Sequence, residues 1–377
     1  MTRAWRVAAA LVLVATAAAL FAWQARESAG PAAFDAPRAT PAPAAAPAVP
    51  GPRPDPAAPT AAQPAADASQ ACADTADPWA DAEALKAAIG PAGDVLLASD
   101  DPEHWLAAAA LGRLPFDAAS ANFAALERAL ARRPEHPLAA ILWLGLCERA
   151  RDDPACAAGR DERFAVGQAG HNGVVWSLLA DRHFRRGEVE AGFAALRRAA
   201  AAPVFDSGFS ELVLLVERGL AASTGLTLAE RAGVAFGTAA ALLPVATAAS
   251  LACREPDVLA THGQACLAYA ARLENEGSSL LEILVGTGLQ AALHDSAGEE
   301  RLAAQVRERE ADLRARYLHD MSGTMERWLW LSEPVLAEYL EELHAHGELA
   351  AREFVVAEYR RRNEQGGIDP CKLVRRQ

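Results

Sequence analysis

The stretch GVVWSLLADRHFRRGEVEAGFAALRRAAAAP, residues 173–203, decides the fold most directly. Apolar residues recur every three or four positions on both sides of Gly187, which is the pattern of two amphipathic helices. Gly187 interrupts that pattern, and it resumes at Glu188. Because so short a turn makes two helices antiparallel neighbours, the stretch predicts a helical hairpin.

Helix signals of the same kind recur along residues 71–377. Proline follows a capping residue at expected helix starts, as in Asp101-Pro102, and glycine marks expected ends, as at Gly347. Isoleucine occurs only four times, while Ala, Leu, Arg and Glu dominate, so composition also favours helices over strands. The predicted fold class is all-α, built from antiparallel helical hairpins. Besides 173–186 and 188–201, the expected helices are 78–90, 102–112, 117–133, 137–150, 207–218, 226–253 with a break at Pro244, 257–274, 278–293, 296–318, 333–346 and 348–363.

Residues 118–203 resemble tetratricopeptide repeats. The family pattern of large, small and aromatic residues is matched, from first helix to terminal proline, by Trp176, Leu179, Ala180, His183, Gly192, Leu196, Ala199 and Pro203. One unit upstream, Ile141, Leu144 and Gly145 repeat the first three at a spacing of 35 residues, and Leu126, Ala129 and Pro134 fit the second helix of a unit before that. The chain departs from the pattern where His183 replaces the aromatic residue and Gly192 replaces alanine. Beyond residue 205 only helices are expected.

The resemblance implies an α-solenoid-like arrangement in the first half of the helical domain. In such proteins the first helices of successive hairpins line a concave surface. The resemblance therefore implies that Ser177, Asp181 and Arg185 face a peptide ligand, although packing between helices also accounts for these residues.

Residues 4–24 predict a membrane segment. The uncharged run 7–23 follows Arg3 and Arg6, and with its flanks it approaches the roughly 20 residues that cross a bilayer. Trp5 and Trp23 suit the two membrane interfaces, and positive charge before the run keeps the N-terminus in the cytoplasm. We therefore expect an N-terminal membrane anchor at residues 1–27, single-pass in the inner membrane, with the rest of the chain in the periplasm.

A cleaved signal peptide is the alternative interpretation of the same run. Cleavage after Ala25 would place Trp23 at the −3 position, where a small residue is preferred. Cleavage after Ala19 leaves small residues at the site but shortens the apolar core. Either interpretation exports the remaining chain, as an anchored or as a secreted periplasmic protein.

A low-complexity segment follows at residues 28–70. Eleven prolines fall between Pro31 and Pro64, separated mostly by alanine. Such a segment cannot bury a core and favours extended polyproline geometry. We expect a disordered linker there, which tethers a helical domain at residues 71–377.

Six cysteines behind an export signal predict disulfides. None of them forms a Cys-x-x-Cys motif, so a thioredoxin-like or zinc-ribbon site is not indicated. Each of two local pairs, Cys147 with Cys156 and Cys253 with Cys266, would join neighbouring helical segments. Cys72 and Cys371 would then join the two ends of the domain; buried free thiols are the alternative for all six.

A second membrane span is the competing interpretation of residues 232–253, which carry no charge. Pro244 interrupts the run, and few of its residues are large and apolar. Cys253 also has its expected partner on the soluble side. A buried core hairpin is the expected structure.

Motifs that carry chemistry are largely missing from the sequence. It contains no His-Glu-x-x-His, no Gly-x-Ser-x-Gly and no P-loop, and His344 and His346 are spaced so that a helix would point them different ways. We therefore predict no cofactor and no metal site. The net charge of −13 argues against a nucleic-acid partner.

The function indicated by these features is a membrane-tethered periplasmic scaffold that binds a protein or peptide in the cell envelope. It is a non-catalytic role. The alternative is a cell-envelope enzyme, for example one that cleaves glycans with a buried glutamate. A purely structural envelope component is a third possibility.

Overall fold

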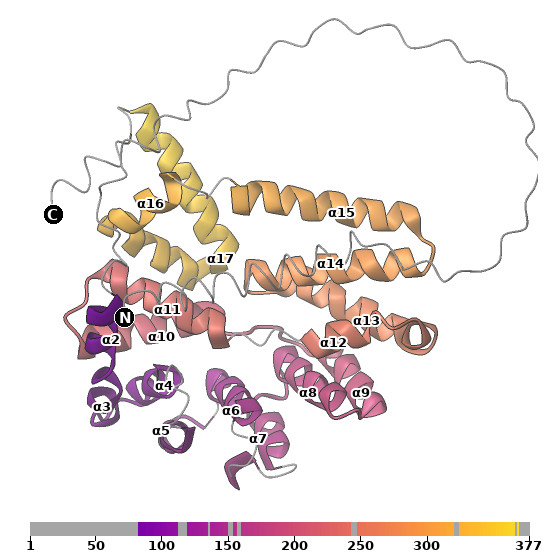
Figure 1. The fold of residues 1–377 in the computed structure, drawn as a ribbon, viewed down its shortest axis with the longest axis horizontal. Coiled ribbons are helices and arrows are strands. Elements are labelled where there is room, and N and C mark those ends of the chain that lie inside the picture. The colour runs from indigo at the N-terminus through magenta and orange to yellow at the C-terminus, as the bar shows by residue number, and fades with distance from the viewer. Residues whose placement is uncertain are drawn as a thin grey trace, which may run out of the picture. The chain divides into compact units, whose positions relative to one another are not determined.

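The computed structural model describes residues 82–111, 119–134, 136–149, 154–156, 160–242, 247–319, 324–365 and 368. Every regular element in these ranges is helical, which confirms the all-α prediction (Figure 1). The predicted anchor 4–24, the linker 28–70, Cys72, Cys371 and Pro244 lie outside the described residues.

The described helices agree with most of the expected ones. They are α2 (Ala82–Ile89), α3 (Ala92–Leu97), α4 (Pro102–Leu111), α5 (Ala119–Arg132), α6 (Pro137–Arg149), the 3-10 turn η1 (Pro154–Cys156), α7 (Arg160–Ala169), α8 (Gly173–Arg185), α9 (Val189–Ala201), α10 (Phe209–Ser223), α11 (Leu228–Leu242), α12 (Thr247–Ala252), α13 (Pro256–Glu276), α14 (Leu280–Ser296), α15 (Glu300–Arg314), the π-helical turn η2 (Ala315–His319), α16 (Thr324–Leu331) and α17 (Glu333–Glu364).

The predicted hairpin at 173–203 is present as α8 and α9, which pack against each other. Gly187 takes a positive φ of 75°, a backbone conformation that glycine adopts without steric cost. Gly192 lets the two helices approach closely, since a Cβ atom there would lie 2.6 Å from the Phe184 ring. Small residues at these two positions therefore fix the turn and the spacing of the hairpin.

Two large hydrophobic cores hold most of the helices together, and a small third one joins Leu280 and Leu284 of α14 to Tyr317 of η2. The first combines α3–α6 with α10, α11, α16 and α17, and the second combines α6–α9 with α12, α13 and α14. Hairpins that follow each other in sequence therefore do not all stack: α10 packs against α3, α4 and α17, whereas α12 and α13 return to α8 and α9. The return of α12 and α13 to α8 and α9 was not expected, because α10 and α11 separate them in the sequence.

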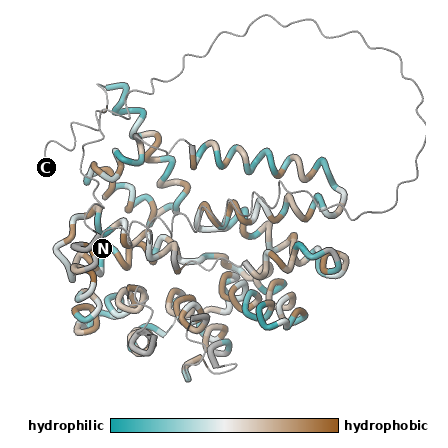
Figure 2. The backbone as a smooth tube through the Cα atoms, in the orientation of Figure 1, coloured by the Kyte–Doolittle hydropathy of each residue, from teal (hydrophilic) through white to brown (hydrophobic). Residues whose placement is uncertain are grey.

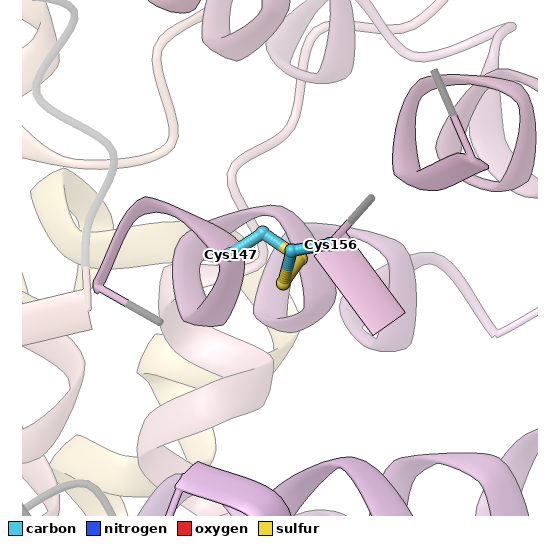
Figure 3. The surroundings of a disulfide bond; sticks show 2 residues. All are labelled: Cys147 and Cys156. Atoms are coloured by element: carbon cyan, nitrogen blue, oxygen red, sulfur yellow. A yellow bond between two sulfur atoms is a disulfide. The ribbon is translucent and has the colours of Figure 1, made fainter. Parts of the chain in front are cut away.

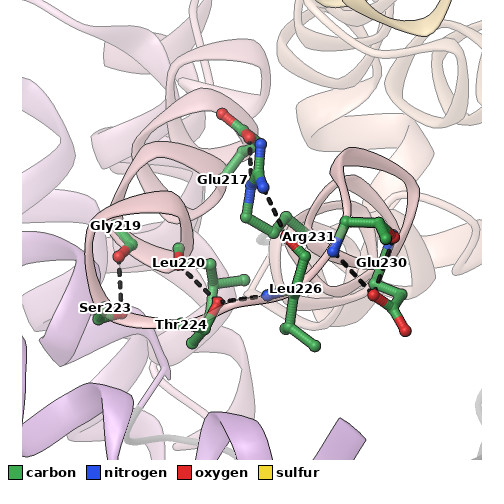
Figure 4. Close-up of polar contacts among 9 residues, drawn as sticks. Glu217, Gly219, Leu220, Ser223, Thr224, Leu226, Glu230 and Arg231 are labelled. Carbon is green, nitrogen blue, oxygen red and sulfur yellow. Dashed lines mark hydrogen bonds and ion pairs between the residues drawn. The ribbon is translucent and has the colours of Figure 1, made fainter. Parts of the chain in front are cut away.

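The α10–α11 hairpin is fastened by a largely buried ion pair (Figure 4). Nε of Arg231 donates to Oε1 of Glu217 at 2.8 Å, and its Nη1 donates to the carbonyl of Leu226 at 2.6 Å. At the start of α11, Thr227 and Glu230 exchange hydrogen bonds in a capping box. The uncharged run 232–253 thus begins inside a hairpin of the first core. No helix among the described residues has the length and apolarity to span a membrane.

Both local disulfides predicted from the sequence are present. Cys147 near the end of α6 is bonded to Cys156 in η1 (Figure 3), and Cys253 after α12 is bonded to Cys266 in α13. The partners are nine and 13 positions apart in the sequence. Each bond therefore joins one helical segment to the next, as expected.

The α14–α15 hairpin carries the most hydrophilic helix. Only Ala303 and Val306 of α15 are buried, and most of the helix is hydrophilic in Figure 2. It packs against α14 along that one narrow apolar stripe.

The helices expected at 333–346 and 348–363 form the two halves of α17. Gly347 separates them with a φ of 84°, so the expected stop is a kink. The short helices α3, α7 and α16 were not expected, because their apolar runs are too short for a clear period.

Candidate functional site

The three residues predicted to face a ligand all lie on α8, and the structure buries two of them. Ser177 is 4% exposed, and its Oγ lies 2.6 Å from the Tyr269 hydroxyl on α13. Asp181 is also 4% exposed, while the Arg185 side chain, which forms an ion pair with Asp181, is 40% exposed. Ser177 and Asp181 are therefore buried between helices, whereas the Arg185 side chain is partly exposed.

Asp181 binds the first turn of α12. Its Oδ1 accepts hydrogen bonds from the backbone N–H groups of Ala248 at 2.6 Å and Ala249 at 3.2 Å. N–H groups in the first turn of a helix have no partner within the helix, and a negative charge is favourable there. Asp181 therefore acts as a capping group supplied by a distant helix.

Tyr269 completes the buried contact with Ser177. Burial raises the pKa of its phenol far above the ordinary value, and the hydrogen bond with Ser177 opposes this shift only in part. The phenol is thus a neutral hydrogen-bonding group that helps to join α8 to α13.

A second polar cluster lies at the start of α14, where three serines surround one carboxyl group. Oε2 of Glu282 accepts from the Ser279 backbone N–H at 2.9 Å and from the hydroxyls of Ser279, Ser207 and Ser278 at 3.0, 3.2 and 3.3 Å. We call these four residues the serine–glutamate cluster. Glu282 and Ser279 together form the capping box of α14, and Ser207 belongs to the connection between α9 and α10.

Burial raises the pKa of Glu282, because its side chain has lost most of its water. The hydrogen bonds from Ser279, Ser207 and Ser278 favour the charged form and oppose this shift. Chemically, the cluster places a proton-binding carboxyl group between segments that are far apart in the sequence. Glu282 is 8% exposed, so the group is a helix-capping element with little access to solvent.

The kink at Gly347 brings α17 to the same end of α14. Glu348 follows the kink, and its Oε2 accepts from the Leu280 backbone N–H at 2.8 Å. Its Oε1 accepts from Nε of Arg352 at 2.8 Å, and Arg352 also donates to the carbonyl of Tyr317 in η2. The start of α14 is therefore capped by Glu348 of α17 and by the serine–glutamate cluster, and Arg352 connects Glu348 to η2.

A histidine–glutamate pair joins the start of α6 to α10. Nε2 of His136 lies 3.4 Å from Oε1 of Glu211, while its Nδ1 is buried with no hydrogen-bond partner. Burial, and then the charge of Arg133, lower the pKa of His136. Burial, and then the charge of Asp206, raise the pKa of Glu211. Both shifts favour the uncharged forms.

Within the described ranges, no three His, Cys, Asp or Glu side chains lie where they could hold a metal ion together. His346 lies 3.8 Å from Glu342 on the same helix, and His344 is exposed. Both histidines are thus exposed side chains of α17, and His346 lies near a carboxylate one turn earlier.

Sequence reasoning missed Glu282, Glu348 and His136. A signal existed for Glu282, because Ser279-x-x-Glu282 before an apolar run is a capping-box pattern. No local signal existed for Glu348 or His136, since their partners come from helices far away in sequence.

No family model, no curated protein and no solved structure matches this chain.

Proposed function

We propose that this chain is a membrane-tethered scaffold, facing the periplasm, that binds a protein or peptide partner in the cell envelope. The observation that carries the proposal is the α8–α9 hairpin, whose sequence resembles the tetratricopeptide pattern. Ala180, Leu196 and Ala199 at the pattern positions are fully buried, and Gly192 packs against Phe184. Stacked hairpins of repeat proteins form extended concave surfaces that are used for binding.

Two disulfides support the periplasmic part of the proposal, because such bonds persist mainly in oxidising compartments. The apolar run at 4–24 supports membrane attachment, and the proline-rich segment 28–70 supports a tether. An uncleaved anchor and a cleaved signal peptide remain the two forms of this proposal. N-terminal sequencing of the mature protein separates them, since an intact anchor begins at or near Met1.

The binding role is tested by crosslinking in intact cells. The full chain with a C-terminal tag is crosslinked and purified from the envelope, next to a matched variant that carries Arg185→Glu. We expect one partner to be recovered with the natural chain and a smaller amount of the same partner to be recovered with the variant. Recovery of no partner above the level of an untagged strain would contradict the proposal.

A glycan-cleaving enzyme is the second candidate, and Glu282 is the observation that favours it. A general acid of this class is a carboxyl group with a raised pKa, as burial gives Glu282. This candidate requires that the full chain releases soluble fragments from cell-wall glycan and that Glu282→Gln does not. If the natural chain releases none, the candidate is eliminated.

A further inference from the structure

The face of α8 that the tetratricopeptide resemblance assigns to a ligand is occupied by another part of the same chain. Asp181 on this face accepts from two backbone N–H groups of α12. Ala249 of α12 is fully buried in the same core as Val174 and Leu179 of α8. α12 therefore covers the part of α8 that the resemblance assigns to a ligand.

α12 is poorly suited to hold this place by itself. It has six residues, fewer than the roughly 12 that an isolated helix needs to be even marginally stable in water. Ser250 Oγ is buried without a hydrogen-bond partner, and Leu251 is 58% exposed. Its position therefore depends on restraints from outside the helix.

The Cys253–Cys266 disulfide supplies such a restraint. Cys253 directly follows α12, and Cys266 lies on α13, which packs against α9. The bond thus ties the end of α12 to α13, which in turn packs against the hairpin that α12 covers. Both cysteines are fully buried, so a reductant does not reach the bond while α12 is in place.

We propose that α12 is an intramolecular cover of the α8 face and that the Cys253–Cys266 disulfide locks this cover. The two thiols lose two protons and two electrons to a thiol–disulfide oxidant, whose own disulfide is reduced to two thiols. The part of the α8 face around Asp181 is open in the reduced chain and covered in the oxidised chain, whereas Arg185 is already partly exposed in the oxidised chain. The inference that the cover controls partner binding rests on the proposed function, whereas the inference that α12 is a cover rests only on the contacts of α12.

Carboxyl footprinting tests the cover without any partner. The full chain is labelled with a carbodiimide and an amine, and mass spectrometry measures modification of Asp181 and of Glu217, a buried carboxylate of the other core. In Cys253→Ser/Cys266→Ser we expect modification of Asp181 to rise about tenfold or more, because α12 can open locally once no covalent bond holds its end. Glu217 should not change, and neither carboxylate should change in the matched variant Cys147→Ser/Cys156→Ser.

A second variant keeps the disulfide and removes one contact. Ala248→Pro removes an N–H group that donates a hydrogen bond to Asp181. The position lies in the first turn of α12, where proline fits. We expect a smaller rise in the labelling of Asp181 in this variant. If Cys253→Ser/Cys266→Ser does not fold, Ala248→Pro serves as the test instead. Unchanged labelling of Asp181 in the folded variants, or an equal rise at Glu217, would overturn the cover. A failed partner search would leave this result standing, so the two proposals fail separately.

Discussion

His183 and Glu188 bridge the turn between α8 and α9: Nδ1 of the histidine lies 2.6 Å from Oε2 of the glutamate. The backbone repeats the connection, because the Glu188 N–H donates to the His183 carbonyl at 2.9 Å. Gly187 between them supplies the positive φ that the turn requires. Side chain and backbone thus close the same six-residue turn.

The α14–α15 hairpin closes in the same way. His294 Nδ1 lies 2.6 Å from Glu299 Oε2, the Glu299 N–H donates to the His294 carbonyl at 2.8 Å, and Gly298 has a φ of 72°. The two turns share the pattern His-x-x-x-Gly-Glu, and the second copy, at residues 294–299, lies beyond residue 205, where the sequence had indicated only helices. The tight turn is therefore used in two hairpins of this chain.

The first prediction concerns the charge of Glu188. The hydrogen bond from His183 lowers the pKa of this carboxyl group, since it favours the charged form. In His183→Asn the pKa should return toward that of an ordinary glutamate. Side-chain NMR titration measures it, and an identical pKa in both proteins would show that the contact does not form in solution.

The second prediction concerns the pH dependence of stability. The folded-state pKa of Glu282 is raised, so the folded chain binds this proton more tightly than the unfolded chain does. The resulting stability is complete below the ordinary glutamate pKa and is lost as the pH rises through the raised value. Urea unfolding between about pH 4 and 8 should therefore show the natural chain losing free energy of unfolding relative to Glu282→Gln. A difference between the two proteins that does not vary with pH would contradict this.

The third prediction concerns the spacing of α8 and α9. Gly192→Ala places a Cβ atom 2.6 Å from the Phe184 ring, so one helix has to move. We expect a loss of about 1–3 kcal/mol in the free energy of unfolding, as for other overpacked sites. The matched control is Gly237→Ala on α11, where a Cβ meets nothing within 4 Å and alanine should stabilise the helix by about 0.5–1 kcal/mol. Equal effects in thermal unfolding would argue against the close approach.

The fourth prediction compares two ion pairs. Arg231→Ala leaves the buried Glu217 without its partner, which should cost about 2–4 kcal/mol of stability. The Arg133–Glu103 pair has a similar distance of 2.9 Å but both of its side chains are well exposed. Arg133→Ala should therefore cost less than about 1 kcal/mol. Chemical denaturation of both variants decides it, and similar losses would show that burial of Glu217 does not matter.

Local features of this chain were predictable, and contacts between distant segments were not. Gly187 and the apolar period around it predicted the α8–α9 hairpin, and short separations predicted the partners of Cys147 and Cys253. The burial of Asp181 could not be predicted, because the helix that it caps begins 66 residues later, beyond an α10–α11 hairpin that packs elsewhere. Sequence periodicity places a residue on a helix face but does not say which other helix covers that face.

The two disulfides have a consequence for how the chain matures. Their partners are nine and 13 residues apart, so each pair meets by closing a short loop, which costs little chain entropy. A chain that emerges with its N-terminus first presents Cys147 and Cys156 together well before Cys253 appears. Each bond can then form while later segments are still unfolded, so oxidation can proceed vectorially and each helical segment is secured to the next in the order of emergence.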